Sequence, residues 1–199
     1  MINGGVVDLV YNRLTDFYLQ SGACRTLQRA LQVGAAVFTP GPRAHALYAN
    51  KKNLAVLCNG DRLRALGADE AAIETLIRAV PATEIVDSRN ADDLWARRKR
   101  LFFKPASGFG SRGTYRGAKL TRGTWAAILD GGYIAQTLVA PGERVLSRGG
   151  ESLTMKVDVR CYAYLGEIQL LGARMYRGQT TNFRTACGGL AAVFTTPGA

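Results

Sequence analysis

The glycine-rich stretch "FFKPASGFGSRGTYRG", residues 102–117, restricts the fold of this chain more than any other feature. Two aromatic residues lead into Lys104 and Pro105, and four glycines then follow by position 117. Serines and arginines lie between these glycines. The pattern therefore predicts an apolar strand, residues 101–104, that ends in a lysine and continues as a flexible, basic, hydroxyl-bearing loop.

Two known phosphate-binding patterns can be compared with this loop. The Walker pattern is excluded, because no Gly-Lys-Ser or Gly-Lys-Thr follows the glycines. The letters "GFGSRG" (108–113) match G-x-G-x-x-G, but a Rossmann loop must open a helix, and "TYRGAKL" is a poor helix start. Glycines still let the backbone approach a ligand closely and direct its N–H groups at phosphate oxygens. A phosphate-binding loop and a plain hairpin turn both stay open.

The rest of the chain indicates an α+β fold. Strands are expected at 6–11, 35–38 and 101–104, and helices at 25–34, 43–58, 61–67, 69–80 and 92–100. After the glycine loop we expect a helix at 121–130, a polar stretch at 140–152, and strands at 133–139, 154–165, 167–176 and 190–194. Alternating residues on both sides of Gly166 favour an antiparallel hairpin. This order, α/β segments followed by mostly antiparallel strands, is typical of the α+β class.

The charge balance predicts an anionic partner. The 199 residues include 26 Lys and Arg against 15 Asp and Glu, a net charge of +11. Nucleic acid, anionic lipid or a phosphorylated small molecule would each fit. The "RRKR" run at 97–100 is typical of a solvated helix end that complements the helix dipole. Because the basic residues are spread along the sequence and no known nucleic-acid-binding motif appears, we do not expect a nucleic-acid partner.

Cysteine and histidine usage argues against a zinc site. The four cysteines (24, 58, 161 and 187) are scattered without close pairs, and His45 is the single histidine, which we interpret as structural. Free thiols suit a reducing cytosol, so we expect a cytoplasmic protein. The start "MINGGVVDLV" does not resemble a signal peptide, and no apolar run reaches the ~20 residues of a membrane helix. The chain opens on a strand and ends soon after one, which suggests an excerpt of a larger fold.

Polar residues around the glycine loop have the chemistry of a metal–triphosphate site. Lys51 and Lys52 lie on the helix expected at 43–58, and Lys104 ends the strand before the loop. Later strands and loops carry further polar residues two positions apart, namely Asp158 with Arg160 and Asn182 with Arg184, and also Arg174. Lysine and arginine neutralise phosphates, whereas Asp and Asn oxygens suit Mg²⁺. With no evident covalent nucleophile, such a site would act by positioning and charge stabilisation.

The order of these motifs resembles the ATP-grasp superfamily, which includes glutathione synthetase, D-alanine–D-alanine ligase and a ribosomal-protein glutamate ligase. The similar segments are "DLVYNR" (8–13), "FTPGPRAHALYANKKNL" (38–54), "LFFKPASGFGSRG" (101–113), "YIAQTLV" (133–139) and residues 156–189. The resemblance covers most of the chain at low identity. It implies two α/β lobes with antiparallel sheets that grip a nucleotide: residues 1–40 as the remnant of an N-terminal substrate domain, and an ATP-grasp domain at 41–199, with lobes at about 41–138 and 139–199.

The resemblance also implies a role for each matching residue. ATP would contact the lysines Lys51 and Lys104, the loop residues Gly108, Gly110, Ser111 and Gly113, and the adenine and ribose residues Gln136, Leu138 and Glu143. Asp158 and Asn182 would hold Mg²⁺, while Arg160, Arg174 and Arg184 would stabilise the transferred phosphoryl group or a carboxylate. The chain departs from the family at Thr180, where the family's metal signature has a second carboxylate. If "FRTACGG" instead matches an earlier arginine–glycine segment, the metal strand would lie beyond Ala199.

The function implied is that of an ATP- and Mg²⁺-dependent carboxylate–amine ligase that forms an acyl phosphate. Its partners would be a small-molecule carboxylate and a small-molecule amine, with no membrane. Two other hypotheses stay open: a basic, non-enzymatic nucleic-acid-binding protein, and an inactive, truncated nucleotide-binding domain.

Overall fold

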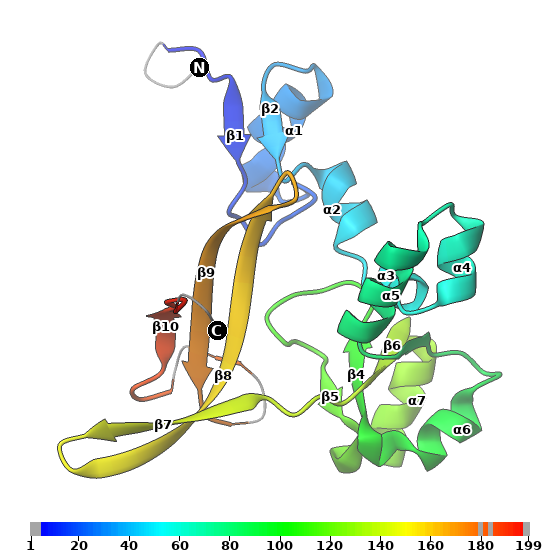
Figure 1. Ribbon diagram of the computed structural model, residues 1–199. Helices are drawn as coiled ribbons and strands as arrows, with labels where there is room; N and C mark the ends of the chain where they lie inside the picture. Colours follow the sequence, from blue (N-terminus) through cyan, green and yellow to red (C-terminus); the bar gives the residue numbers. More distant parts are fainter. Residues whose placement is uncertain (1–4, 179–180, 183–184, 197–199) are drawn as a thin grey trace. The chain divides into compact units, whose positions relative to one another are not determined.

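The computed structural model describes residues 5–178, 181–182 and 185–196 of the chain. The chain divides into two compact units, Met1–Leu138 and Val139–Ala199, and each is described by itself (Figure 1). Both units contain antiparallel sheets, and all the helices of the described residues belong to the first. The mixed α/β composition with antiparallel sheets agrees with the α+β class expected from the sequence.

The first unit contains a four-stranded antiparallel sheet in the order β3-β6-β4-β5, with strands Thr83–Ile85, Tyr133–Thr137, Leu101–Pro105 and Tyr115–Arg116. Because side chains alternate along a strand, β4 divides its residues between the two faces. Leu101 and Phe103 are buried in a core with Trp125 of α7 (Arg122–Asp130) and Leu94 of α6 (Ala91–Ala96). Phe102 and Lys104 therefore lie on the opposite face of the sheet.

Short helices precede this sheet in the sequence: α2 (Pro42–Tyr48), α3 (Asn53–Leu57), α4 (Gly60–Ala65) and α5 (Glu70–Ala79). Side-chain caps begin two of them, since Asn59 accepts a hydrogen bond from the backbone N–H of Arg62 and Asp69 accepts one from Ala72. The prediction of a single helix at 43–58 is wrong. The structure has two helices there, α2 and α3, with a turn between them.

The first residues of the described chain form a small parallel pair of strands, β1 (Leu9–Tyr11) and β2 (Val37–Thr39). The 3-10 helix η1 (Gly22–Cys24) and the helix α1 (Arg25–Gln32) connect them, as a parallel pair requires a crossover. Both strands and the helix were expected from the sequence, at slightly different bounds. Large hydrophobic side chains such as Leu9 and Val37 remain exposed here.

The second unit is a four-stranded antiparallel sheet in the order β7-β8-β9-β10, with strands Gly142–Arg148, Glu151–Tyr164, Glu167–Tyr176 and Gly189–Ala192. The expected hairpin around Gly166 is confirmed as β8 and β9. Leu165 and Gly166 both have positive φ, 49° and 83°, as a tight hairpin turn requires. The sequence did not predict β7, because "GERVLSR" is polar and gives no clear strand signal.

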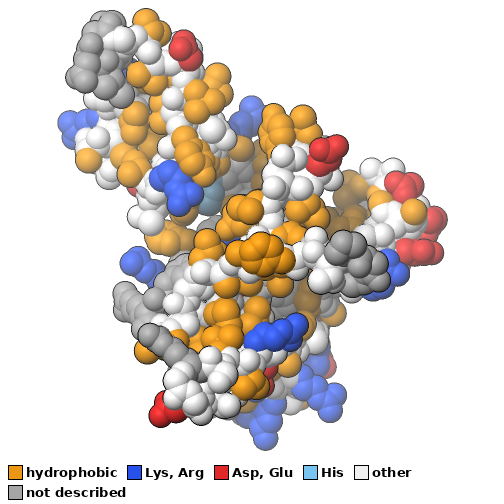
Figure 2. All heavy atoms as spheres, turned by 60° about the vertical axis from the view of Figure 1, so that its left-hand side comes forward, with side chains coloured by type: hydrophobic (Ala, Val, Ile, Leu, Met, Phe, Trp, Pro, Cys, Tyr) orange, Lys and Arg blue, Asp and Glu red, His pale blue; other side chains and the backbone are white. Residues whose placement is uncertain are grey.

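Many large hydrophobic side chains are exposed in both units (Figure 2). Within the described ranges, no helix combines the length and the hydropathy that a bilayer crossing requires.

Candidate functional site

Two lysines from distant parts of the sequence meet beside the glycine loop in the first unit. Lys51 lies in the turn between α2 and α3, and its ammonium group donates to the carbonyl oxygen of Gly108 at 3.0 Å. Lys104 lies near the end of β4, four residues before that glycine. The N–H of Lys51 donates to the carbonyl oxygen of Ala106, two residues after Lys104, so the two lysines belong to neighbouring segments. The positive charge of Lys51 also lowers the pKa of Lys104.

The turn that carries Lys51 is fixed by its own backbone. The side-chain oxygen of Asn50 accepts a hydrogen bond from the N–H of Lys52 at 2.9 Å, which turns the chain away from a helix. The N–H of Lys51 donates to the carbonyl oxygen of Ala106 at 2.8 Å. These bonds hold Lys51 against the first residues of the glycine loop instead of on an exposed helix face.

Lys104 is held by a chain of hydrogen bonds across the sheet. Its ammonium group donates to Oε1 of Gln136 at 2.7 Å, and Nε2 of Gln136 donates to Oγ1 of Thr83 at 2.9 Å. The hydroxyl of Thr83 donates in turn to the carbonyl oxygen of Pro81 at 2.8 Å. Gln136 and Thr83 are both buried. These hydrogen bonds fix the orientation of the Gln136 amide, because only its oxygen can accept from the ammonium group of Lys104.

Burial lowers the pKa of both lysines, and for Lys104 the charge of Lys51 lowers it further. In the described part of the chain, neither ammonium group lies within ion-pair distance of a carboxylate. Two partly desolvated cations without an acidic partner are unfavourable on their own and become favourable when an anion binds. The arrangement therefore has the electrostatics of an anion site.

The glycine loop has a backbone that few other residues could adopt. Gly108, Gly110 and Gly113 have φ of 127°, 63° and 64°, and Ser111 between them has φ of 60°. The hydroxyl of Thr114 donates to the carbonyl oxygen of Ser111 at 2.8 Å and closes the turn. The loop residues of the predicted site, including Ser111, are exposed to solvent. Their N–H groups can therefore be reached by a ligand.

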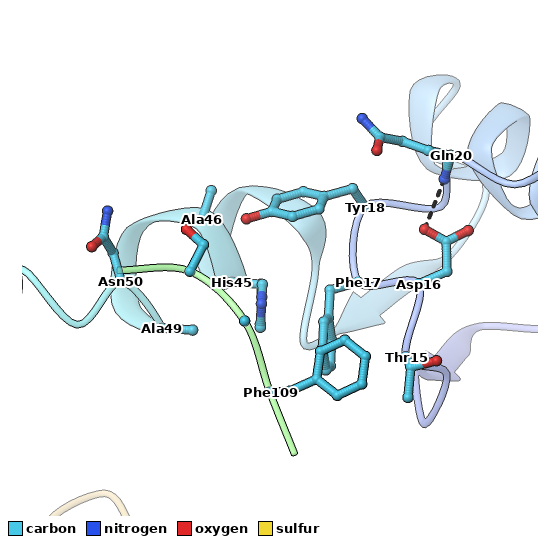
Figure 3. Close-up of a pocket in the computed structure, with 12 residues that line it drawn as sticks. Thr15, Asp16, Phe17, Tyr18, Gln20, His45, Ala46, Ala49, Asn50 and Phe109 are labelled. Atoms are coloured by element: carbon cyan, nitrogen blue, oxygen red, sulfur yellow. Dashed lines mark hydrogen bonds between the residues drawn. The ribbon is translucent and has the colours of Figure 1, made fainter. Parts of the chain in front are cut away.

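An aromatic cluster fixes the loop at Phe109 (Figure 3). The ring of Phe17 lies edge-on to Phe109, with centroids 5.4 Å apart, and stacks on His45 at 4.0 Å. This ring contact supports the structural interpretation of His45. A pocket of about 250 Å³ lies beside the cluster and is lined by Asp16, Asn50 and Ser107 among others. The carboxylate of Asp16 accepts the N–H groups of Ser21 and Gln20, which lower its pKa to about 2.

The two residues expected at adenine make other contacts. Gln136 is occupied by Lys104 and Thr83, as described above. The N–H of Leu138 donates to the carbonyl oxygen of Arg100 at 2.9 Å. In this arrangement the N–H of Leu138 and one of the two N–H donors of Gln136 are engaged within the protein, and the amide oxygen of Gln136 holds a lysine in place.

The candidate metal and phosphoryl residues belong to the second unit. Asp158 makes a two-point ion pair with Arg174, at 2.6 and 3.0 Å, and accepts a hydrogen bond from the hydroxyl of Thr181 at 2.8 Å. Burial raises the pKa of Asp158, but the hydrogen bonds from Arg174 and Thr181 outweigh it, so the pKa is lowered. Arg160 is exposed and lies on the same face of β8 as Asp158.

The remaining predicted residues of this unit are Asn182, Glu143 and Arg184. The amide nitrogen of Asn182 donates to the carbonyl oxygen of Arg177 at 3.0 Å, and its oxygen accepts from the hydroxyl of Thr185 at 2.9 Å. Glu143 is exposed on β7. Arg184 lies outside the described residues. Among those described, no three His, Cys, Asp or Glu side chains form a group that could hold a metal ion, so the Mg²⁺ assignment stays a prediction.

Sequence reasoning missed Thr83 and Cys58. The short strand β3 carries Thr83, and the thiol of Cys58 accepts the N–H of Thr83 at 3.3 Å and approaches its carbonyl oxygen at 3.5 Å. The segment "ATEIVD" has the alternation of a strand, but it is short and follows a proline, so the helix before it dominates the pattern.

Comparison with known proteins gives no family for this chain. No protein-family model matches the chain, and no curated protein matches it.

Proposed function

We propose that the chain is an ATP- and Mg²⁺-dependent carboxylate–amine ligase of the ATP-grasp type. The observation that carries the proposal is the meeting of Lys51 and Lys104 at the glycine loop, without a carboxylate partner in the described residues. A triphosphate is the anion that best suits two fixed cations beside exposed backbone N–H groups.

Each group in the first unit has a definite part in this proposal. Lys51 and Lys104 neutralise phosphate oxygens, and Gln136 and Thr83 keep the Lys104 ammonium group in place before the ligand arrives. The loop from Gly108 to Gly113 supplies N–H donors and excludes water when it closes over the phosphates. A bound polyanion restores the pKa of both lysines by stabilising their charged forms.

The proposed reaction has two steps. An oxygen of the substrate carboxylate attacks the γ-phosphorus of ATP, and the bond to the β–γ bridging oxygen breaks, which gives an acyl phosphate and ADP. The nitrogen of the amine then attacks the acyl carbon, inorganic phosphate leaves, and the amine loses a proton as the amide forms. The protein contributes charge stabilisation and positioning in both steps, as is general for phosphoryl transfer.

Magnesium, when bound, would supply positive charge that offsets the charge of the phosphates and of the leaving group. Asp158 and Asn182 are the residues assigned to it by resemblance. Carboxylate and amide oxygens are suitable ligands, although Asp158 is engaged by Arg174 and Thr181 in this structure and would have to share or exchange those bonds.

The proposal is tested by titrating the protein with ATP, with and without Mg²⁺, and following the melting temperature and the binding heat. We expect a rise in melting temperature, because ATP binds only the folded state. Lys104→Met should weaken binding about 10- to 150-fold, the equivalent of one charge-assisted hydrogen bond of about 1.5–3 kcal/mol. Lys119→Met, which removes an exposed lysine elsewhere in the same unit, is the matched control. Equal ATP affinity for the two variants would sink the nucleotide site.

Turnover is tested separately, by measuring ADP release with a panel of carboxylates and amines. ADP release that requires both a carboxylate and Mg²⁺ supports the ligase. Tight ATP binding without release under any pairing would favour the inactive nucleotide-binding domain instead.

A further inference from the structure

A second cationic region lies in the first unit and is not used by the proposed ligase chemistry. It consists of Arg98, Lys99 and Arg100 of the 3-10 helix η2 (Arg98–Arg100), Lys119 of η3 (Gly117–Lys119) and Arg122 at the start of α7, and is called the basic cluster below. The sequence separates its two halves by about twenty residues, and the fold brings them together.

Close backbone packing joins the two halves. A Cβ atom on Gly117 would lie 1.9 Å from the carbonyl oxygen of Arg98, so only glycine permits this approach. The guanidinium groups of Arg98 and Arg122 both lie over the ring of Trp95, 3.9 and 4.1 Å from its centre. Arg98 also donates to the carbonyl oxygen of Trp95 at 2.7 Å. Two arginines are thus ordered by one indole ring.

The cluster differs from its neighbour Arg97 in having no acidic partners. Arg97 pairs with Glu84 and Asp93, both at 2.7 Å, as a structural ion pair. In the portion of the chain that the structure describes, no carboxylate lies within ion-pair distance of any member of the cluster. The "RRKR" run is therefore divided: its first residue is neutralised, and the other three join Lys119 and Arg122.

We propose that the basic cluster binds the phosphate backbone of nucleic acid without regard to base sequence. Arginines whose guanidinium groups already lie over an aromatic ring present N–H donors at little entropic cost, and these donors match phosphate oxygens. The expectation of no nucleic-acid partner rested on basic residues being spread along the sequence, and folding gathers five of them. The inference is independent of the proposed ligase function.

The surroundings of the cluster favour nucleic acid over a lipid surface. Trp95 and Leu120 are half-buried, and the exposed large hydrophobic residues include none between 95 and 104 or between 116 and 126. A membrane-surface site normally adds apolar side chains that enter the headgroup region. With Trp95 covered by arginines, base stacking is also not available, so the contacts are to phosphates.

The test measures binding of a fluorescein-labelled 20-base-pair DNA duplex by anisotropy at several salt concentrations. The variant is Lys99→Gln with Lys119→Gln, which leaves the stacked arginines and their packing intact. The control is Arg25→Gln with Arg29→Gln, two exposed residues of α1 in the same unit, so the net charge changes equally. ATP binding is measured in parallel and should be the same in both variants, which separates this test from that of the ligase.

Wild-type protein should bind the duplex with a steep decrease in affinity as salt rises. Loss of two phosphate contacts should reduce the slope of log K against log salt by about 1.8 and weaken binding by up to about 60-fold at 0.1 M salt. The control variant should keep the wild-type slope. Equal losses in the two variants would mean that net charge alone attracts DNA, and the proposal would be overturned. The proposal would also be overturned if the protein bound polyglutamate or phosphatidylserine vesicles but did not bind the duplex.

Discussion

Replacement of Gln136 by leucine tests the hydrogen-bond chain that holds Lys104. Leucine has nearly the same size, but it removes the acceptor for the ammonium group at 2.7 Å and the donor to Thr83 at 2.9 Å. A hydrogen bond to a charged group contributes about 1.5–3 kcal/mol, and a neutral one about 0.5–1.5 kcal/mol. Because Gln136 is only 7% exposed, water can replace these bonds only in part. We therefore expect the free energy of unfolding to fall by about 2–4 kcal/mol.

The assay is urea unfolding followed by tryptophan fluorescence. Both tryptophans of the chain, Trp95 and Trp125, belong to the first unit and lie in or against its core, so the signal reports that unit alone. A loss below about 0.5 kcal/mol would refute the reasoning, since it would mean that neither hydrogen bond contributes to stability.

A double-mutant cycle separates the charged bond from general damage to the sheet. Lys104→Met combined with Gln136→Leu removes both partners, and replacing both by apolar groups leaves no unsatisfied cation. The double variant should be more stable than the sum of the single effects predicts, by about 1 kcal/mol or more. Additive losses would contradict a direct coupling between Lys104 and Gln136.

Three further results are expected. ATP affinity should fall as the pH rises, and the fall should begin at a pH below 10.5, the pKa of an ordinary lysine. Burial lowers the pKa of Lys104, and only its charged form attracts phosphate. Lys104→Arg should flatten this pH profile in calorimetric titrations. Gly117→Ala should lower the melting temperature sharply, since the new methyl group would meet the carbonyl oxygen of Arg98 at 1.9 Å, whereas Gly123→Ala, with open space around it, should not. Asp158→Asn should cost about 1–3 kcal/mol at neutral pH through the lost pairing with Arg174. The lowered pKa of Asp158 means that its contribution is complete above about pH 4, and the difference between the proteins should shrink as the pH falls below the ordinary 3.8.

Local patterns predicted most of the secondary structure. The helices with clear apolar spacing and the hairpin at Gly166 appear where they were expected, because their sequence periods match the elements they form. The strand β4, which carries Lys104, was also predicted apart from its last residue, since "LFF" has no competing helical pattern. The long helix at 43–58 was not correct, because Asn50 favours a turn through its side chain and the N–H of Lys51 bonds to Ala106, a contact that only the folded chain provides.

The structure shows one contact between residues of the predicted site in the first unit, from Lys51 to Gly108, whereas their role in binding a nucleotide stays a prediction. Lys51, Lys104 and Gly108 come together as a lysine–loop group, which their positions in the motifs suggested. The role of Gln136 could not be read from the sequence, because its partner Thr83 lies on a strand that is set by pairing across the sheet. The basic cluster could not be predicted either, because its two halves are brought together only by the packing of η2 on η3.

The contact between Cys58 and Thr83 gives the first unit a built-in chemical reporter. Cys161 and Cys187 are exposed and should react rapidly with a thiol reagent, whereas Cys58 is half-buried and bonded at the edge of the sheet. Modification of Cys58 requires β3 to separate from it, so its labelling rate measures how often that strand opens. If ATP stabilises the hydrogen bonds that run from Thr83 through Gln136 to Lys104, the same rate should slow on binding. Occupancy of the proposed nucleotide site could then be followed by chemistry at a cysteine that does not belong to it.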